Sequence, residues 1–160
     1  MTQQRRGNTI AMTPEERDHF LAEERTCRLA TVDYRGKPHV TPLWFVWDGT
    51  AIWLYSLVKS QRWTDVQRHC DIAVVVDSGT DYLTLRGVEI RGTATAAGEV
   101  PRTETPDPSL VTPERLFALK YLSGGDFYAD HRHAWLRVIP QKITSWDFHK
   151  LTTSDNLSPR

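Results

Sequence analysis

The sequence predicts a small, mainly β protein whose antiparallel strands close into a barrel. Three observations predict this fold. Six or seven short segments alternate apolar and polar residues, as strands with one buried face do. Turn residues such as Tyr34–Gly36 and Asp48-Gly49 separate neighbouring segments, which favours hairpins. Helical segments interrupt the strands without a regular βα repeat, so a doubly wound parallel sheet is excluded, and closure is favoured because it removes exposed edges.

Composition places the chain among globular proteins of one domain. It has 160 residues, of which 39% are hydrophobic, enough for a packed core. The 20 Lys and Arg residues balance the 20 Asp and Glu residues, so the formal charge is zero. Without a broad electrostatic field, we expect no nucleic-acid or membrane partner and a ligand held by local charge.

No segment suggests a membrane span or export. The longest apolar runs, Leu43–Trp47 and Ile72–Val76, are far shorter than the roughly 18 residues that a spanning helix needs. No signal-peptide stretch follows the polar N-terminus. Cys27 and Cys70 are isolated and lack metal-site spacing, as expected of ordinary thiols in a reducing compartment. We therefore expect a cytoplasmic protein without a bound metal.

The first third of the chain predicts a helix followed by a three-stranded meander. Residues 1–12 are polar and aperiodic, which is typical of a mobile tail. Thr13–Glu16 supplies a capping Thr, a Pro at the first helical position and a Glu that completes a capping box, so a helix should run to about Arg25. Strands are then expected over 27–32, 39–46 and 51–56.

The middle of the chain predicts a second helix and a longer strand system. Ser60 can cap a helix that extends to about His69, and an apolar strand follows over 72–77. Residues 83–97 read as one long strand or a strand pair, bent by bulges at Gly87 and Gly92. The proline-rich residues 98–110 are expected to form a surface loop.

The last third predicts one more helix and two strands. Thr112–Glu114 should begin a helix that ends before Gly124-Gly125. Strands are expected over 135–139 and 143–147, divided by Pro140. The predicted domain therefore spans residues 13–151, and residues 152–160 form a polar tail.

One short motif points to an anion site. The signatures GxGxxG, GxxxxGK[ST], HExxH and GxSxG do not occur in the sequence. Lys59–Arg62, with the sequence Lys-Ser-Gln-Arg, stands where a strand passes into a helix. First-turn amides, the helix dipole and two cations would together favour a phosphate there. The alternative is that Lys59 and Arg62 are solvated side chains beside an ordinary Ser cap.

The strands before this motif carry an apolar and aromatic wall. Thr41–Trp44 and Trp53–Ser56 combine aromatic rings with hydroxyl groups, and Pro42 frees one backbone position from ladder pairing. A flat ring system needs such a wall for its faces and backbone groups at its edge. The two features together predict a site for a phosphorylated ring cofactor.

The order of several segments resembles that of the pyridoxamine-phosphate-oxidase-like split barrels. The similarity covers roughly residues 12–151, and the closing segment 145–151 looks most like the deazaflavin-dependent branch, the B class of flavin/deazaflavin oxidoreductases. The segments that carry the resemblance are Arg28–Val32, Gly36–Pro42, Ile52–Ser56, Lys59–Arg62, Leu85–Val88 and Ser145–Leu151.

The resemblance implies a split β-barrel homodimer with two equivalent cofactor sites at the subunit interface. It assigns the phosphate to Lys59, Ser60 and Arg62. It places Trp146 near the cofactor of the partner chain. The residues that it implies along the ring and its linker are Thr41, Pro42, Leu43, Trp44, Tyr55 and Ser56.

The resemblance leaves three hypotheses for function. Relatives often have Ser-Arg-Lys where this chain has Ser60-Gln61-Arg62, so one cation is lost. This favours coenzyme F420, which has a phosphodiester and an acidic tail, over FMN. The leading hypothesis is an F420-dependent reductase that transfers hydride to an unsaturated, conjugated organic substrate. The others are an FMN-dependent oxidoreductase and a non-catalytic carrier of a flavin, a deazaflavin or haem.

No catalytic side chain is assigned from the sequence. His39 and His69 are lone histidines, which are seldom proton donors on that evidence alone. Four residues of metal-ligand type gather after the third predicted helix, but a solvated loop is the favoured interpretation because no further ligand cluster accompanies them. These four are Asp126, Asp130, His131 and His133.

Overall fold

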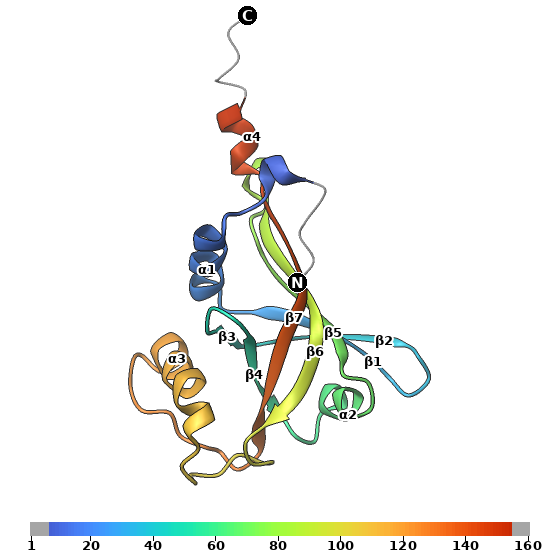
Figure 1. Cartoon of the computed structure of the whole chain (residues 1–160), viewed down its shortest axis with the longest axis vertical. Helices are drawn as coiled ribbons and strands as arrows, with labels where there is room; N and C mark the ends of the chain where they lie inside the picture. Colours follow the sequence, from blue (N-terminus) through green and yellow to red (C-terminus); the bar gives the residue numbers. More distant parts are fainter. Residues whose placement is uncertain (1–6, 155–160) are drawn as a thin grey trace, which may run out of the picture.

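The structure is a computed structural model that describes residues 7–154, and it contains one antiparallel sheet (Figure 1). In the described part of the chain the strands lie in the order β2-β1-β5-β6-β7-β4-β3. The mainly β, curled architecture that the sequence predicts is confirmed. The strands are β1 (Cys27–Val32), β2 (Pro38–Leu43), β3 (Phe45–Trp47), β4 (Ile52–Leu57), β5 (Asp71–Ser78), β6 (Arg86–Ala97) and β7 (His133–Asp147).

The two outermost strands of the sheet are neighbours in the sequence. β2 ends at Leu43 and β3 begins at Phe45, so only Trp44 separates the two edges. A single residue cannot bridge a flat sheet of this width, because its reach is about 3.5 Å. The sheet must therefore curl until its edges come together at Trp44. The expectation of one continuous strand over 39–46 is wrong at this residue.

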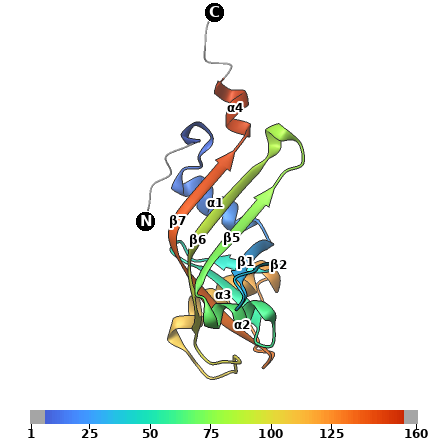
Figure 2. The same cartoon turned by 90° about the vertical axis from the view of Figure 1, so that its right-hand side faces the viewer.

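β6 and β7 form the longest ladder, which runs from Arg86 opposite Asp147 to Ala97 opposite Trp135. The division of β7 at Pro140 that the sequence predicts is wrong. A register shift after Arg91 places Pro140 opposite Gly92, which accommodates a residue without an N–H group. Figure 2 shows β5, β6 and β7 side by side along this extended part of the sheet.

Local capping signals fix the starts of two helices. In α1 (Pro14–Glu23) Thr13 and Glu16 form the predicted capping box, and Ser60 caps α2 (Gln61–Arg68). α3 (Val111–Tyr121) begins one residue before Thr112 and is not capped by a side chain. α1 and α3 pack against β3, while α2 packs against β1 and β6. No helix in the described residues is long and apolar enough to cross a membrane.

The ends of the described chain pack together. Residues 1–6 of the predicted N-terminal tail lie outside the described residues, but Met12 is buried and its N–H donates to Ser145 Oγ at 3.0 Å. The Nζ of Lys150 donates to the carbonyl of Ala11 at 2.8 Å. The sequence did not predict α4 (His149–Ser154), into which the start of the expected C-terminal tail falls. The rest of that tail, 155–160, also lies outside the described residues.

Two apolar clusters fill the molecule. The larger one lies within the curl of the sheet and includes Phe20, Leu29 and Leu136. The smaller one joins α3 to β4 and β7 through Phe117, Trp53 and Trp135. Partly buried aromatic residues pack against the smaller cluster, and the candidate site opens beside them.

Candidate functional site

A cavity of about 390 Å³ lies where β4, the start of α2, α3 and the segment before β7 meet. Its size suits a ring-bearing small molecule. Most of its wall is apolar or aromatic, and its polar groups are few. The lining residues are Leu43, Trp44, Tyr55, Arg62, Phe117, Leu122, Phe127, Tyr128, Asp130 and His133.

Arg62 is the cation that lines this cavity. Its side chain is half-buried, and its Nε donates to Ser56 Oγ at 3.0 Å. No carboxylate among the described residues lies within 4.0 Å of its guanidinium, and burial lowers its pKa below the ordinary value. A partly desolvated charge without a protein counter-ion is stabilised by an anionic ligand.

Ser60 shapes the backbone beside Arg62. Its Oγ accepts the Trp63 N–H at 3.3 Å and donates to the Leu57 carbonyl at 2.7 Å. This cap orders the first turn of α2, whose amides at Gln61 and Arg62 have no intrahelical acceptor. The hydroxyl of Ser60 is therefore committed to the helix, and its contribution to an anion site comes through the backbone that it orders.

Lys59 and Gln61, the neighbours of Ser60 in the sequence, have different surroundings. Lys59 is exposed and has no carboxylate within ion-pair distance in the described part of the chain. Gln61 is held by buried Asp65, whose Oδ1 accepts from Gln61 Nε2 at 2.6 Å while its Oδ2 accepts from Thr31 Oγ1 at 2.8 Å. Asp65 thus anchors α2 to β1 and also holds the Gln61 amide. The cations left for a phosphate are Lys59 and Arg62.

Thr41 carries an unusual polar group. Its Oγ1 is buried and has no hydrogen-bond partner among the described residues. A buried hydroxyl without a partner is costly, so it marks a position where a ligand atom would be stabilised. Thr41 shares a face of β2 with the cavity residue Leu43, because alternate strand residues point the same way. Pro42 between them is exposed.

The aromatic wall continues from Trp44 to α3. Trp44 stacks on Tyr121, with centroids 4.4 Å apart, and it remains 48% exposed. Phe117 and Tyr121 are not among the site residues predicted from the sequence. Their spacing of four residues places both on one face of a helix, and this was the available signal.

Asp130 and His133 form a polar pair in the cavity wall. Asp130 Oδ2 lies 2.6 Å from His133 Nδ1, and the ring of His133 stacks on Tyr55 with centroids 5.1 Å apart. Burial raises the pKa of Tyr55 to about 12, so its hydroxyl is neutral at physiological pH. The favoured interpretation of this segment as a solvated loop missed the pair. No group of three or more metal-ligating side chains occurs in residues 7–154.

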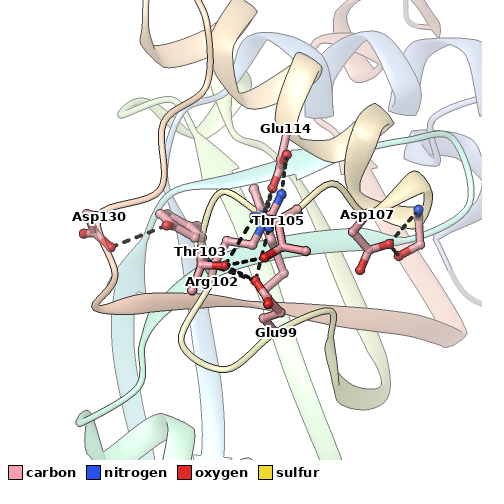
Figure 3. A network of polar contacts seen from close by, with 10 residues as sticks. Glu99, Arg102, Thr103, Thr105, Asp107, Glu114 and Asp130 are labelled. Carbon is pink, nitrogen blue, oxygen red and sulfur yellow. Dashed lines mark hydrogen bonds and ion pairs between the residues drawn. The ribbon is translucent and has the colours of Figure 1, made fainter.

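Figure 3 shows an ion pair between Arg102 and Glu114 that is connected to the aromatic wall of the cavity. Arg102 donates to both carboxylate oxygens of Glu114, at 2.7 and 3.3 Å, and to the Thr105 carbonyl at 2.6 Å. Glu114 also accepts from Trp135 Nε1 at 3.3 Å. Because Trp135 contacts Phe117, this network links the loop after β6 to the aromatic face of α3.

Trp146 lies far from this cavity in the same chain. It follows His133 by 13 residues along β7, which corresponds to about 40 Å at the usual strand rise. Its ring covers Gly87 of β6, where an added Cβ would lie 2.2 Å from Trp146 Cζ2. Of the predicted site residues, the structure gathers Leu43, Trp44, Tyr55 and Arg62 around the cavity and Ser56 behind them.

Comparisons with known proteins agree with this fold. A conserved hypothetical protein from Mycobacterium tuberculosis is 28% identical, with a TM-score of 0.77 over 99% of this chain and 95% of the other. A solved F420 reductase is 23% identical, with a TM-score of 0.58 over 79% of this chain and 94% of that one. The haem storage protein HutZ from Vibrio cholerae is 14% identical, with a TM-score of 0.66 over 84% and 94%.

No curated protein matches the sequence. The family model described as pyridoxamine 5'-phosphate oxidase, however, matches residues 13–147, which include every strand and the whole cavity. The match confirms the split-barrel resemblance that the sequence segments carry. The chain belongs to the pyridoxamine 5'-phosphate oxidase family.

Proposed function

We propose that this protein is an oxidoreductase that binds reduced coenzyme F420 in the cavity beside α2 and reduces an unsaturated organic substrate. One observation carries the proposal: a half-buried Arg62, without a carboxylate partner within residues 7–154, stands in the wall of an aromatic cavity of about 390 Å³. Such a cavity offers both a counter-charge for a phosphate and flat surfaces for a ring.

The residues present fit this group. Arg62, Lys59 and the first-turn amides of α2 would hold the phosphate, with Ser56 orienting the guanidinium. The buried hydroxyl of Thr41 would gain a partner from the polar edge of the ring, and Trp44 would face the ring itself. A reduced deazaflavin supplies a hydride, so the protein need not supply a redox side chain. The side chains of the wall position the reactants and exclude water.

The charge of the site favours F420 over FMN. The phosphodiester of F420 carries one negative charge, whereas the phosphate monoester of FMN carries nearly two. Gln61 stands where relatives often have an arginine, and its amide is engaged by Asp65. One half-buried cation and one exposed lysine match the smaller charge. A solved F420 reductase shares the fold. The proposal also includes a homodimer, in which Trp146 of one chain approaches the cofactor of the other.

Titration of the protein with F420 and with FMN, followed by quenching of Trp fluorescence, tests the proposal. We expect F420 to bind more tightly, and Arg62→Met to weaken its binding by about 10- to 100-fold, as for loss of a hydrogen-bonded charge. Arg115→Met, an exposed change on α3, is the matched control and should leave the affinity unchanged. Equal F420 affinity in the Arg62 variant would refute the site.

The same experiment separates the rival functions. Tighter binding of FMN than of F420 would favour the FMN-dependent oxidoreductase. Binding of F420 without oxidation of the reduced form by a panel of enones and quinones would favour a carrier.

A further inference from the structure

We propose that His133, oriented by Asp130, is the proton donor to the substrate in this cavity. The inference rests on the proposed reductase function and goes beyond it by assigning a catalytic side chain. It also names the substrate class, a flat acceptor in which a carbonyl is conjugated with a carbon–carbon double bond. Both residues line the same cavity as Arg62 and Tyr55.

The backbone holds the Asp130 carboxylate in place. Its Oδ1 accepts the N–H groups of Arg132 and His133, each at 3.0 Å. Its Oδ2 is thereby directed to His133 Nδ1 at 2.6 Å. These amides and the imidazole outweigh the opposing effect of burial and hold the pKa of Asp130 below its ordinary value. The carboxylate is therefore ionised where it meets the ring.

The imidazole ring is fixed as well. It stacks on Tyr55 at an interplanar angle of 28°, and the Tyr55 hydroxyl lies 3.4 Å from Asp130 Oδ1. With Nδ1 donating to Asp130, the second nitrogen, Nε2, has no hydrogen-bond partner among the described residues. A carboxylate on one nitrogen of an imidazole fixes the tautomer and the orientation of the ring, and it lies against the charge that the ring carries when both nitrogens hold a proton.

Reduction of a conjugated acceptor needs a proton as well as a hydride. The β-carbon of the acceptor would receive the hydride that a reduced deazaflavin supplies: a new C–H bond would form there as the donor C–H bond breaks and the deazaflavin is oxidised. The electron pair of the C=C bond moves toward the carbonyl, and the Nε2–H bond of protonated His133 breaks as its proton passes to the resulting enolate. His133 ends neutral and takes a proton from water. Such proton transfer typically contributes about 10²- to 10⁴-fold to the rate.

The wall of the cavity matches this substrate class. Phe117, Phe127 and Tyr128 offer flat apolar surfaces, and the polar groups around the ring are few. The titratable or charged groups that share the cavity with His133 are Asp130, Tyr55, Arg62 and Tyr128. Tyr55 stays neutral because its pKa is about 12.

Single-turnover reduction of cyclohex-2-enone by protein loaded with reduced F420 tests the proposal. We expect His133→Gln to slow the reaction by about 100-fold with F420 affinity unchanged. Asp130→Asn should also slow the reaction, because the carboxylate that orients the imidazole is gone. His131→Asn, at an exposed neighbour with positive φ that Asn tolerates, should match the wild type.

A measurement without cofactor gives a second readout. In ¹⁵N-histidine-labelled protein, NMR should show neutral His133 with its proton on Nδ1, and Asp130→Asn should shift the proton toward Nε2. A proton on Nε2 in the wild type, or an unchanged rate in His133→Gln, would overturn the proposal. A wild type that binds F420 and reduces quinones but no enone would overturn proton donation to a conjugated carbonyl and leave the reductase function standing. Failure to bind F420 would overturn the proposed function as well.

Discussion

Trp44, the single residue between β2 and β3, stacks on Tyr121 of α3 with the ring planes only 7° apart. The hydroxyl of Tyr121 also accepts the Phe45 N–H at 3.1 Å and lies 2.8 Å from the carbonyls of Arg25 and Phe45. One side chain thus satisfies the backbone where the strand is interrupted and supports the cavity wall. The packing of α3 therefore links the backbone conformation at Trp44 and Phe45 to the shape of the cavity.

Tyr121→Phe should lower the free energy of unfolding by about 1–2 kcal/mol, because the Phe45 N–H loses its acceptor in a partly buried place. The stacked ring is retained, so F420 affinity should change less than stability does. Urea denaturation measures the loss. Tyr34→Phe, on an exposed turn, is the control and should have no effect. Equal stability of both variants with the wild type would contradict the role given to the hydroxyl.

Ser56→Ala should weaken F420 binding by about 3- to 10-fold, a smaller loss than that of Arg62→Met. The cation remains, but Arg62 Nε loses the acceptor that orients it toward the cavity. Fluorescence titration measures the change. Ser78→Ala on β5 is the comparison and should bind as the wild type does. If Ser56→Ala bound F420 as tightly as the wild type, orientation of Arg62 by Ser56 would have no part in binding.

Gly87→Ala should destabilise the protein by about 1–3 kcal/mol, because the new Cβ would lie 2.2 Å from Trp146 Cζ2. Replacing the indole should relieve the clash, so Gly87→Ala combined with Trp146→Leu should cost less than the sum of the two single changes. Thermal unfolding of the four proteins measures this coupling. Strict additivity would show that Trp146 does not determine the need for glycine.

Lys120 has a partly buried amine and does not line the candidate cavity, and Lys120→Met tests how this amine affects stability. Lys120 Nζ lies 3.9 Å from the Phe45 ring centroid, and burial lowers its pKa to about 8 from 10.5. Between these values the folded protein binds fewer protons than the unfolded chain, so the free energy of unfolding should rise with pH. This rise, about 1–2 kcal/mol for a partly exposed group, should be absent in the variant.

Urea denaturation of both proteins at pH 7.5 and pH 10 gives the measurement. The raised pKa of Cys27, about 12, acts oppositely at high pH, and Lys120 and Cys27 interact electrostatically, so both proteins are compared in a Cys27→Ala background. A difference that does not change with pH would contradict the lowered pKa of Lys120.

Elements whose signals are local were predictable from the sequence. Thr13 and Ser60 cap their helices through contacts within three residues, so both helices begin where expected. The continuity of β7 through Pro140 depends instead on a register shift in β6, a different part of the chain. No local pattern carries that information.

Some residues of the candidate site were likewise predictable from the sequence, and others were not. Leu43, Trp44, Tyr55 and Arg62 belong to segments whose residue types already suggest a ring and a phosphate, and the structure gathers them. The opposite wall depends on how α3 and the segment before β7 fold over the sheet. His133 could not be assigned from its position in the sequence, because its partner in the stack comes from β4.

The corner at Trp44 has a consequence for the topology of the protein. Covalent connectivity, rather than a row of interstrand hydrogen bonds, joins the two margins of the sheet. A circular permutant with new termini at residue 44 would keep every ladder yet lose the tether between those margins. The curled sheet would then be free to open at this point, and ligand binding would become the step that holds its two margins together.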